Sequence, residues 1–104
     1  MPHYLSQVSY TPEAWARLVA HPQDRIEAVR GPIEKLGGRI HNAFFAFGEY
    51  DVVAIAELPG NDAAVAMGLG SVSAGALSKY NTTVLLSPEE AVSAMKTPGG
   101  TFVS

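Results

Sequence analysis

The chain contains no cysteine in its 104 residues, so it can form neither disulfides nor thiolate metal sites. It is also poor in charge, because only 16% of its residues are charged and about a quarter is usual. Lys and Arg do not exceed Asp and Glu, and the net charge is −3. The chain therefore lacks the basic surface with which proteins bind nucleic acid or anionic membranes. We expect neither as a partner.

Long hydrophobic runs are missing as well. No apolar stretch approaches the ~20 residues of a membrane-spanning helix, and residues 1–10 lack the basic and apolar regions of a secretion signal. We therefore expect a cytoplasmic protein. Apolar residues make up 47% of the chain, which suits one globular core. We expect a single domain over residues 1–96 and a loose tail over residues 97–104.

Aromatic and alternating segments predict four β-strands. They span residues 3–10, 39–47, 50–58 and 77–86. Only Gly48-Glu49 separates the second strand from the third, which predicts a hairpin with a tight turn. The third strand is apolar on both faces across its middle, as is typical of a central strand.

Apolar periodicity and capping signals predict the helices. A helical region covers residues 12–36 and is interrupted at His21-Pro22. Pro32 lies in its second half, where it should kink or break the helix because it lacks an N–H. We expect Asn61 to cap the next helix and Ser87 to begin a short terminal helix with a capping box.

The order of these elements is β-α-β-β-α-β with a terminal helix. It predicts an α+β fold of ferredoxin-like topology, in which helices cover one face of a four-stranded antiparallel sheet. The other face must meet water, a ligand or another subunit. The apolar third strand and the low surface charge favour a second copy of the chain, so we expect a homodimer or a higher homo-oligomer.

The hairpin sequence FGEYDVV, residues 47–53, resembles the signature of the GYD-domain family of small bacterial proteins. Further similar segments follow in order along nearly the whole chain. They are Tyr10-Thr11-Pro12, Leu36-Gly37-Gly38, residues 63–70, Gly75, Thr82-Thr83 and Ser87-Pro88-Glu89-Glu90. The resemblance implies a ferredoxin-like domain that packs sheet against sheet, as in dimeric α+β barrels. It implies no activity, since the family is uncharacterised. The sequence departs from the family pattern at Gly31-Pro32 and at Glu49.

Tyr50 and Asp51 begin the third predicted strand beside the hairpin turn. A phenol next to a carboxylate can bind or protonate a small polar ligand. Alternatively, Asp51 accepts backbone N–H bonds in the turn, and Tyr50 packs on a neighbouring helix. The sequence leaves both interpretations open.

The histidines form a second set of candidates. His3 and His41 both lie on predicted strands and could meet across the sheet, whereas His21 lies in a loop. Arg39 shares a strand face with His41, and a cation beside an imidazole could hold a carboxylate. None of the histidines shows metal-ligand spacing, so we expect no metal and no cofactor.

The glycine-rich segment 68–75 superficially resembles a phosphate-binding loop. It does not follow a strand and lacks the Lys-Ser/Thr ending, so we interpret its glycines as sites of close backbone packing.

Two functions remain. One is an oligomeric domain that binds a small molecule in a pocket on the sheet or at the subunit interface. The alternative is a cofactor-free enzyme of the dimeric α+β barrel type, such as a monooxygenase, isomerase or cyclase. A cavity containing His, Tyr and an acid would favour the enzyme, and an apolar cavity would favour binding.

Overall fold

A computed structural model of the chain describes residues 1–98. Its elements are β1 (His3–Tyr10), α1 (Pro12–Ala20), α2 (Arg25–Lys35), β2 (Arg39–Phe45), β3 (Val52–Glu57), α3 (Asn61–Ser73), β4 (Leu77–Leu85) and α4 (Pro88–Lys96). The strands form one antiparallel sheet in the order β2-β3-β1-β4. This arrangement confirms the predicted ferredoxin-like α+β fold. None of the helices within residues 1–98 is long and apolar enough to cross a membrane.

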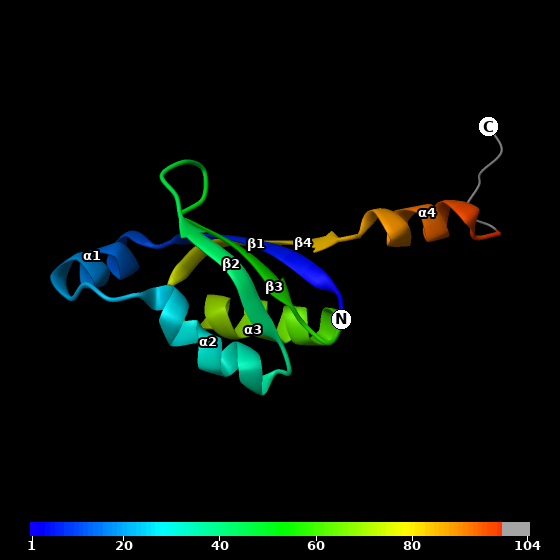
Figure 1. Cartoon of the computed structure of the whole chain (residues 1–104). Coiled ribbons are helices and arrows are strands. Elements are labelled where there is room, and N and C mark those ends of the chain that lie inside the picture. Colours follow the sequence, from blue (N-terminus) through cyan, green and yellow to red (C-terminus); the bar gives the residue numbers. More distant parts are fainter. Residues whose placement is uncertain (99–104) are drawn as a thin grey trace.

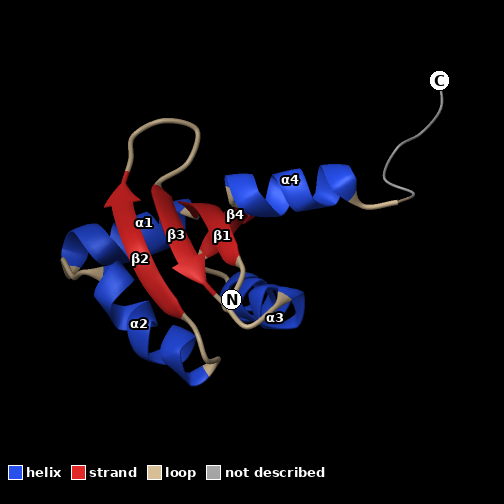
Figure 2. Cartoon of the chain, turned by 45° about the vertical axis from the view of Figure 1, so that its right-hand side comes forward, coloured by secondary structure: helices blue, strands red, loops and turns tan. Residues whose placement is uncertain are grey.

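Helices α2 and α3 lie on the same side of the sheet and leave the opposite side uncovered by either (Figures 1 and 2). The buried core between these layers consists of Tyr4, Ile33, Leu58 and Ala64. Tyr4 is only 1% exposed, and its hydroxyl donates to Asn61 Oδ1 at 2.7 Å. The largest core side chain thus satisfies its polar end at the start of α3, as a buried hydroxyl must.

Two local predictions are wrong, and a third is wrong in part. Of the kink or break expected at Pro32, the break is absent, because helix α2 continues through Pro32 to Lys35. Asn61 is not a cap, since Gly60 occupies that position and the Asn61 side chain accepts from Tyr4 instead. The hairpin has no tight turn: β2 ends at Phe45 and β3 begins at Val52, so a six-residue loop joins them (Figure 1).

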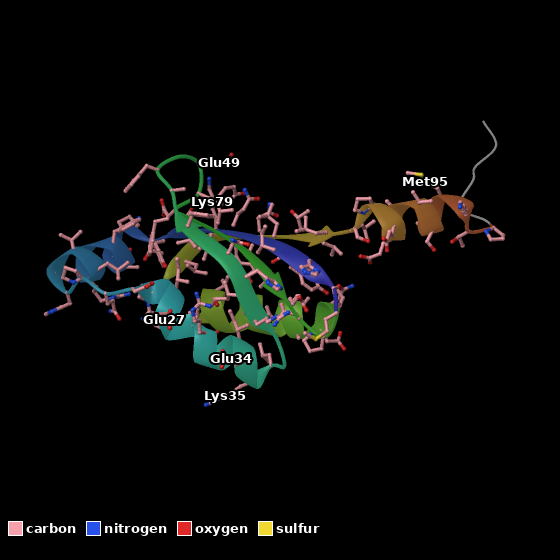
Figure 3. All side chains as sticks on the ribbon, viewed as in Figure 1. Glu27, Glu34, Lys35, Glu49, Lys79 and Met95 are labelled. Carbon is pink, nitrogen blue, oxygen red and sulfur yellow. The ribbon has the colours of Figure 1, made fainter. Side chains whose placement is uncertain are left out.

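The capping box of α4 is confirmed. Ser87 Oγ accepts from the Glu90 backbone N–H at 3.0 Å, and Glu90 Oε1 accepts from the Ser87 N–H at 3.1 Å. The helix projects away from the sheet and gives the molecule a long axis of 56 Å (Figure 1). None of its residues is buried, and Met95 is 74% exposed (Figure 3). Most of the expected tail, residues 99–104, lies outside the described residues.

Gly68 lets α3 approach β4 closely. A Cβ atom at this position would lie 2.9 Å from Cε1 of the Tyr80 ring, which is closer than side chains pack. The expectation of close backbone packing in the glycine-rich segment is therefore right for Gly68. It is wrong for Gly70 and Gly75, where a Cβ would meet nothing within 4 Å.

Candidate functional site

A cavity of about 580 Å³ lies between the sheet and helices α2 and α3. All four strands contribute to its inner wall, and the two helices form its outer wall. Small residues such as Ala43, Ala54 and Ala56 line the strands here, so the side chains do not fill the space between the layers. The volume is within the range of about 300–1,000 Å³ that is usual for small-molecule sites.

Unpartnered hydroxyl groups lie along the inner wall of this cavity. Within residues 1–98, Ser6 Oγ, Tyr80 Oη and Thr82 Oγ1 are buried without a hydrogen-bond partner. Ser6 and Tyr80 line the cavity, and Ser6 is only 7% exposed. Thr82 pairs with Ser6 across β1 and β4, so it lies on the same face of the sheet. Leaving a buried hydroxyl unpaired costs about 1–3 kcal/mol, and most native proteins avoid it.

The charged groups of the lining are all cations. Within the described residues, only Arg25 and Lys35 contribute charge to the cavity wall, and both come from α2. Lys35 points away from the sheet, so its ammonium group lies at the outer rim (Figure 3). Tyr10 also lines the cavity, and burial raises the pKa of its phenol, although Arg25 opposes that shift. No imidazole or carboxylate of residues 1–98 lines the cavity.

Three of the predicted site residues meet on the opposite face of the sheet. Strand β3 lies between β1 and β2, and its Glu57 pairs with His3 on one side and with Arg39 on the other. Paired residues share a face, so both side chains reach Glu57. A register shift between Ile40 and Asn42 marks a β-bulge at His41. Such a bulge bends the strand and redirects a side chain, and His41 also reaches Glu57.

Glu57 Oε1 is the centre of this cluster. It lies 2.6 Å from His41 Nε2, 3.3 Å from His3 Nε2 and 3.5 Å from Arg39 Nη2. The two imidazole rings stack with their centroids 5.3 Å apart. The hydrogen bond from His41, helped by the charges of Arg39 and the histidines, lowers the pKa of the Glu57 carboxyl below its ordinary value. Glu57 itself supplies the carboxylate that Arg39 and His41 were expected to hold.

The structure places Tyr50 and Asp51 away from this cluster, at the other end of β3. Asp51 Oδ2 accepts from the Tyr10 backbone N–H at 2.8 Å and from the Trp15 indole N–H at 3.1 Å. These donors belong to β1 and α1 and not to the turn. Tyr50 is half-buried and does not line the cavity. A ligand-binding role for this pair remains a prediction.

Sequence reasoning missed Glu57, Ser6 and Tyr80. The register of three adjacent antiparallel strands brings Glu57 level with His3 and Arg39, and the spacing within a single segment does not reveal that register. Ser6 and Tyr80 gave no signal, because polar residues alternate along many strands. Their burial depends on how α2 and α3 pack over the sheet.

No functionally curated protein matches the chain. The family model of the GYD domain matches residues 4–95, which cover all of β2, β3 and β4 and all but one residue each of β1 and α4. The chain belongs to the GYD domain family.

Proposed function

We propose that this protein binds a small molecule in the cavity between the sheet and helices α2 and α3. The observation that carries the proposal is the pair of unpartnered hydroxyl groups, Ser6 Oγ and Tyr80 Oη, in the wall of a mainly apolar cavity. A ligand group that hydrogen-bonds to them would remove the cost of their burial. The expected ligand is a mainly apolar molecule. One polar group would reach the Ser6 and Tyr80 hydroxyls, and a neutral or anionic group would lie towards Arg25 and Lys35.

Binding is favoured over the enzyme alternative by where the ionisable groups lie. General acid–base catalysis most often uses an imidazole or a carboxylate within hydrogen-bond reach of the substrate, and less often Lys or Tyr. His3, His41 and Glu57 lie on the other face of the sheet, and the cavity offers only Tyr, Arg and Lys as ionisable groups among the described residues. The cavity is therefore better suited to holding a molecule than to transforming it.

We further propose that the domain works as a homo-oligomer that pairs through the open sheet face. Strand pairing places Leu5, Ile55, Val53 and Phe44 on this face, and Phe44 is 66% exposed. The net charge of only −3 and the low charge content give two copies little electrostatic reason to repel each other. Packing these apolar side chains against their copies would remove them from water, and a two-fold pair is the commonest self-complementary arrangement.

A dye-binding experiment tests the cavity. The probe is anilinonaphthalene sulfonate, which has an apolar ring body and an anionic group. We expect the folded protein to bind it saturably, and native mass spectrometry of freshly purified protein to detect any ligand that is retained from the cell.

The two variants place a leucine side chain on opposite faces of β3. Ala54→Leu fills the cavity from the sheet side, whereas Val53→Leu adds bulk on the open face. We expect Ala54→Leu to abolish saturable dye binding and Val53→Leu to leave it unchanged. Equal binding by a folded Ala54→Leu variant would refute the proposal.

A further inference from the structure

The open face of the sheet carries a group of residues that the cavity does not involve. His3, His41 and Glu57 each offer one ligand atom, and the three atoms lie within 4.8 Å of one another. They come from three adjacent strands, β1, β2 and β3, which hold them at one end of the sheet. We propose that these three side chains form a binding site for a divalent transition-metal ion such as Zn²⁺, Co²⁺ or Fe²⁺.

The separations of the ligand atoms fit such an ion. A tetrahedral ion with bonds of about 2.0–2.2 Å to nitrogen and oxygen holds its ligand atoms roughly 3.3 Å apart. His3 Nε2 already lies 3.3 Å from Glu57 Oε1. His41 Nε2 lies 2.6 Å from the same oxygen, so a small rotation of its ring would open the required space. Both imidazoles present Nε2 to the same carboxylate oxygen, and a turn of the stacked rings would direct both lone pairs to one ion.

The kind of ligand selects the kind of ion. Two imidazoles and one carboxylate suit Zn²⁺, Co²⁺ and Fe²⁺, whereas Mg²⁺ and Ca²⁺ prefer oxygen ligands. Three protein ligands leave at least one coordination position open, as in catalytic sites and unlike closed structural sites. The His3 and Glu57 side chains are 47% and 15% exposed, so the open position lies on the sheet face opposite α2 and α3, at the other end of β3 from the Phe44–Val53 pair.

Arg39 opposes a cation at this site. Its Nη2 lies 3.5 Å from Glu57 Oε1, but its side chain is 66% exposed and can turn into solvent. In that position its guanidinium group could pair with an anion bound at the open coordination position. The site would then hold a metal ion and an anionic ligand together, on the opposite face of the sheet from the cavity.

The test measures metal binding to the untagged protein after treatment with a chelator. Zn²⁺ and Co²⁺ are titrated by calorimetry, and Co²⁺ is also followed by visible absorption, which reports tetrahedral coordination. We expect saturable binding of up to one ion per chain, a visible Co²⁺ band, and a higher melting temperature with metal, because ligands that bind only the folded state stabilise it. Mg²⁺ should produce none of these effects.

The variants His41→Ala and Glu57→Gln each remove one ligand. Loss of a group that only orients a metal ligand costs 10–100-fold in affinity, so loss of a ligand should cost at least about 100-fold. His21→Ala is the matched control, because it removes an exposed histidine from the loop that follows α1. We expect it to bind metal as the wild type does. The proposal is overturned if the wild type shows no saturable binding, or if folded His41→Ala and His21→Ala bind equally well.

Discussion

The indole N–H of Trp15 donates to Asp51 Oδ2 at 3.1 Å, and so the β2–β3 loop is joined to helix α1. The same oxygen accepts the Tyr10 N–H at 2.8 Å. We therefore predict that Asp51→Ala lowers the free energy of unfolding by about 1–3 kcal/mol, since two donors lose their acceptor. Urea denaturation measures the change.

A matched control for this substitution lies in the same loop. Glu49 is exposed near the tip of the loop, and its replacement by Ala should change stability by less than about 0.5 kcal/mol (Figure 3). Gly48→Val should also be tolerated, because Gly48 does not have a positive φ and a Cβ there meets nothing within 4 Å. A melting temperature of Asp51→Ala equal to that of the wild type would show that the two hydrogen bonds are not structural.

Tyr80→Phe should separate stability from ligand binding. The substitution deletes a buried hydroxyl that has no partner within residues 1–98, so we expect the unliganded protein to become more stable by up to about 1 kcal/mol. Because Phe cannot hydrogen-bond to a ligand, the affinity for the ligand or the dye should fall. Thermal melts and dye titration of the same samples measure both effects. If the substitution lowers the melting temperature, the hydroxyl has a partner within the protein and the argument for the cavity is lost.

Gly68→Ala and Gly70→Ala should change stability in opposite directions. Replacing Gly by Ala inside a helix usually gains about 0.5–1 kcal/mol. We expect that gain at Gly70, where the added methyl group meets nothing within 4 Å. At Gly68 it would lie 2.9 Å from the Tyr80 ring, and displacing a packed side chain costs about 1–3 kcal/mol. Chemical denaturation should show Gly68→Ala to be the less stable variant.

The sequence predicted the fold well because the relevant signals are local. Strand alternation, the capping box of Ser87 and the Thr11-Pro12 helix start depend only on neighbouring residues, and the structure contains all of them. The errors arose where distant contacts decide the conformation. Asn is a favoured N-cap residue, but the Asn61 side chain here accepts a hydrogen bond from the buried Tyr4 hydroxyl instead. The prediction of a tight turn was wrong because Asp51 accepts hydrogen bonds from β1 and α1, and the connection from β2 to β3 is a longer loop that allows these contacts.

The candidate site could be predicted only in part, for a similar reason. His3 and His41 were correctly suspected of meeting across the sheet, and Arg39 of lying beside His41. Their common partner, Glu57, depends on the register of β3 against both neighbours and on the bulge at His41. Neither is encoded in the spacing of any single segment. The cavity is harder still to predict, because it is the space between the sheet and helices α2 and α3 that no side chain occupies.

The pH dependence of stability should report the Glu57 cluster. The pKa of Glu57 is lowered in the folded state, chiefly by its hydrogen bond with His41. A carboxyl with a lowered pKa stabilises the fold above its unfolded pKa and loses that contribution as the pH falls through the folded value. The wild type should therefore lose stability as the pH falls below 4.5, which is the ordinary pKa of a Glu carboxyl. The Glu57→Gln variant should lose less stability over the same range. Urea denaturation from neutral pH down to about pH 3 tests this. Parallel pH profiles of the two proteins would contradict it.

Self-association should depend on Phe44. Its side chain is 66% exposed, and it pairs with Val53 on the open face, where a second copy would cover both. We predict that light scattering at micromolar concentration gives at least twice the monomer mass of 11.0 kDa. Phe44→Lys should shift the protein to monomer, because each interface would then bury two unpaired charges.

Phe47→Lys is the control: Phe47 is 97% exposed, but it lies in the β2–β3 loop outside the sheet, so the oligomer should persist. A monodisperse wild-type monomer would rule out pairing through this face, and an oligomer that survives Phe44→Lys would place the interface elsewhere, with the apolar residues of the projecting α4 as the next surface to test.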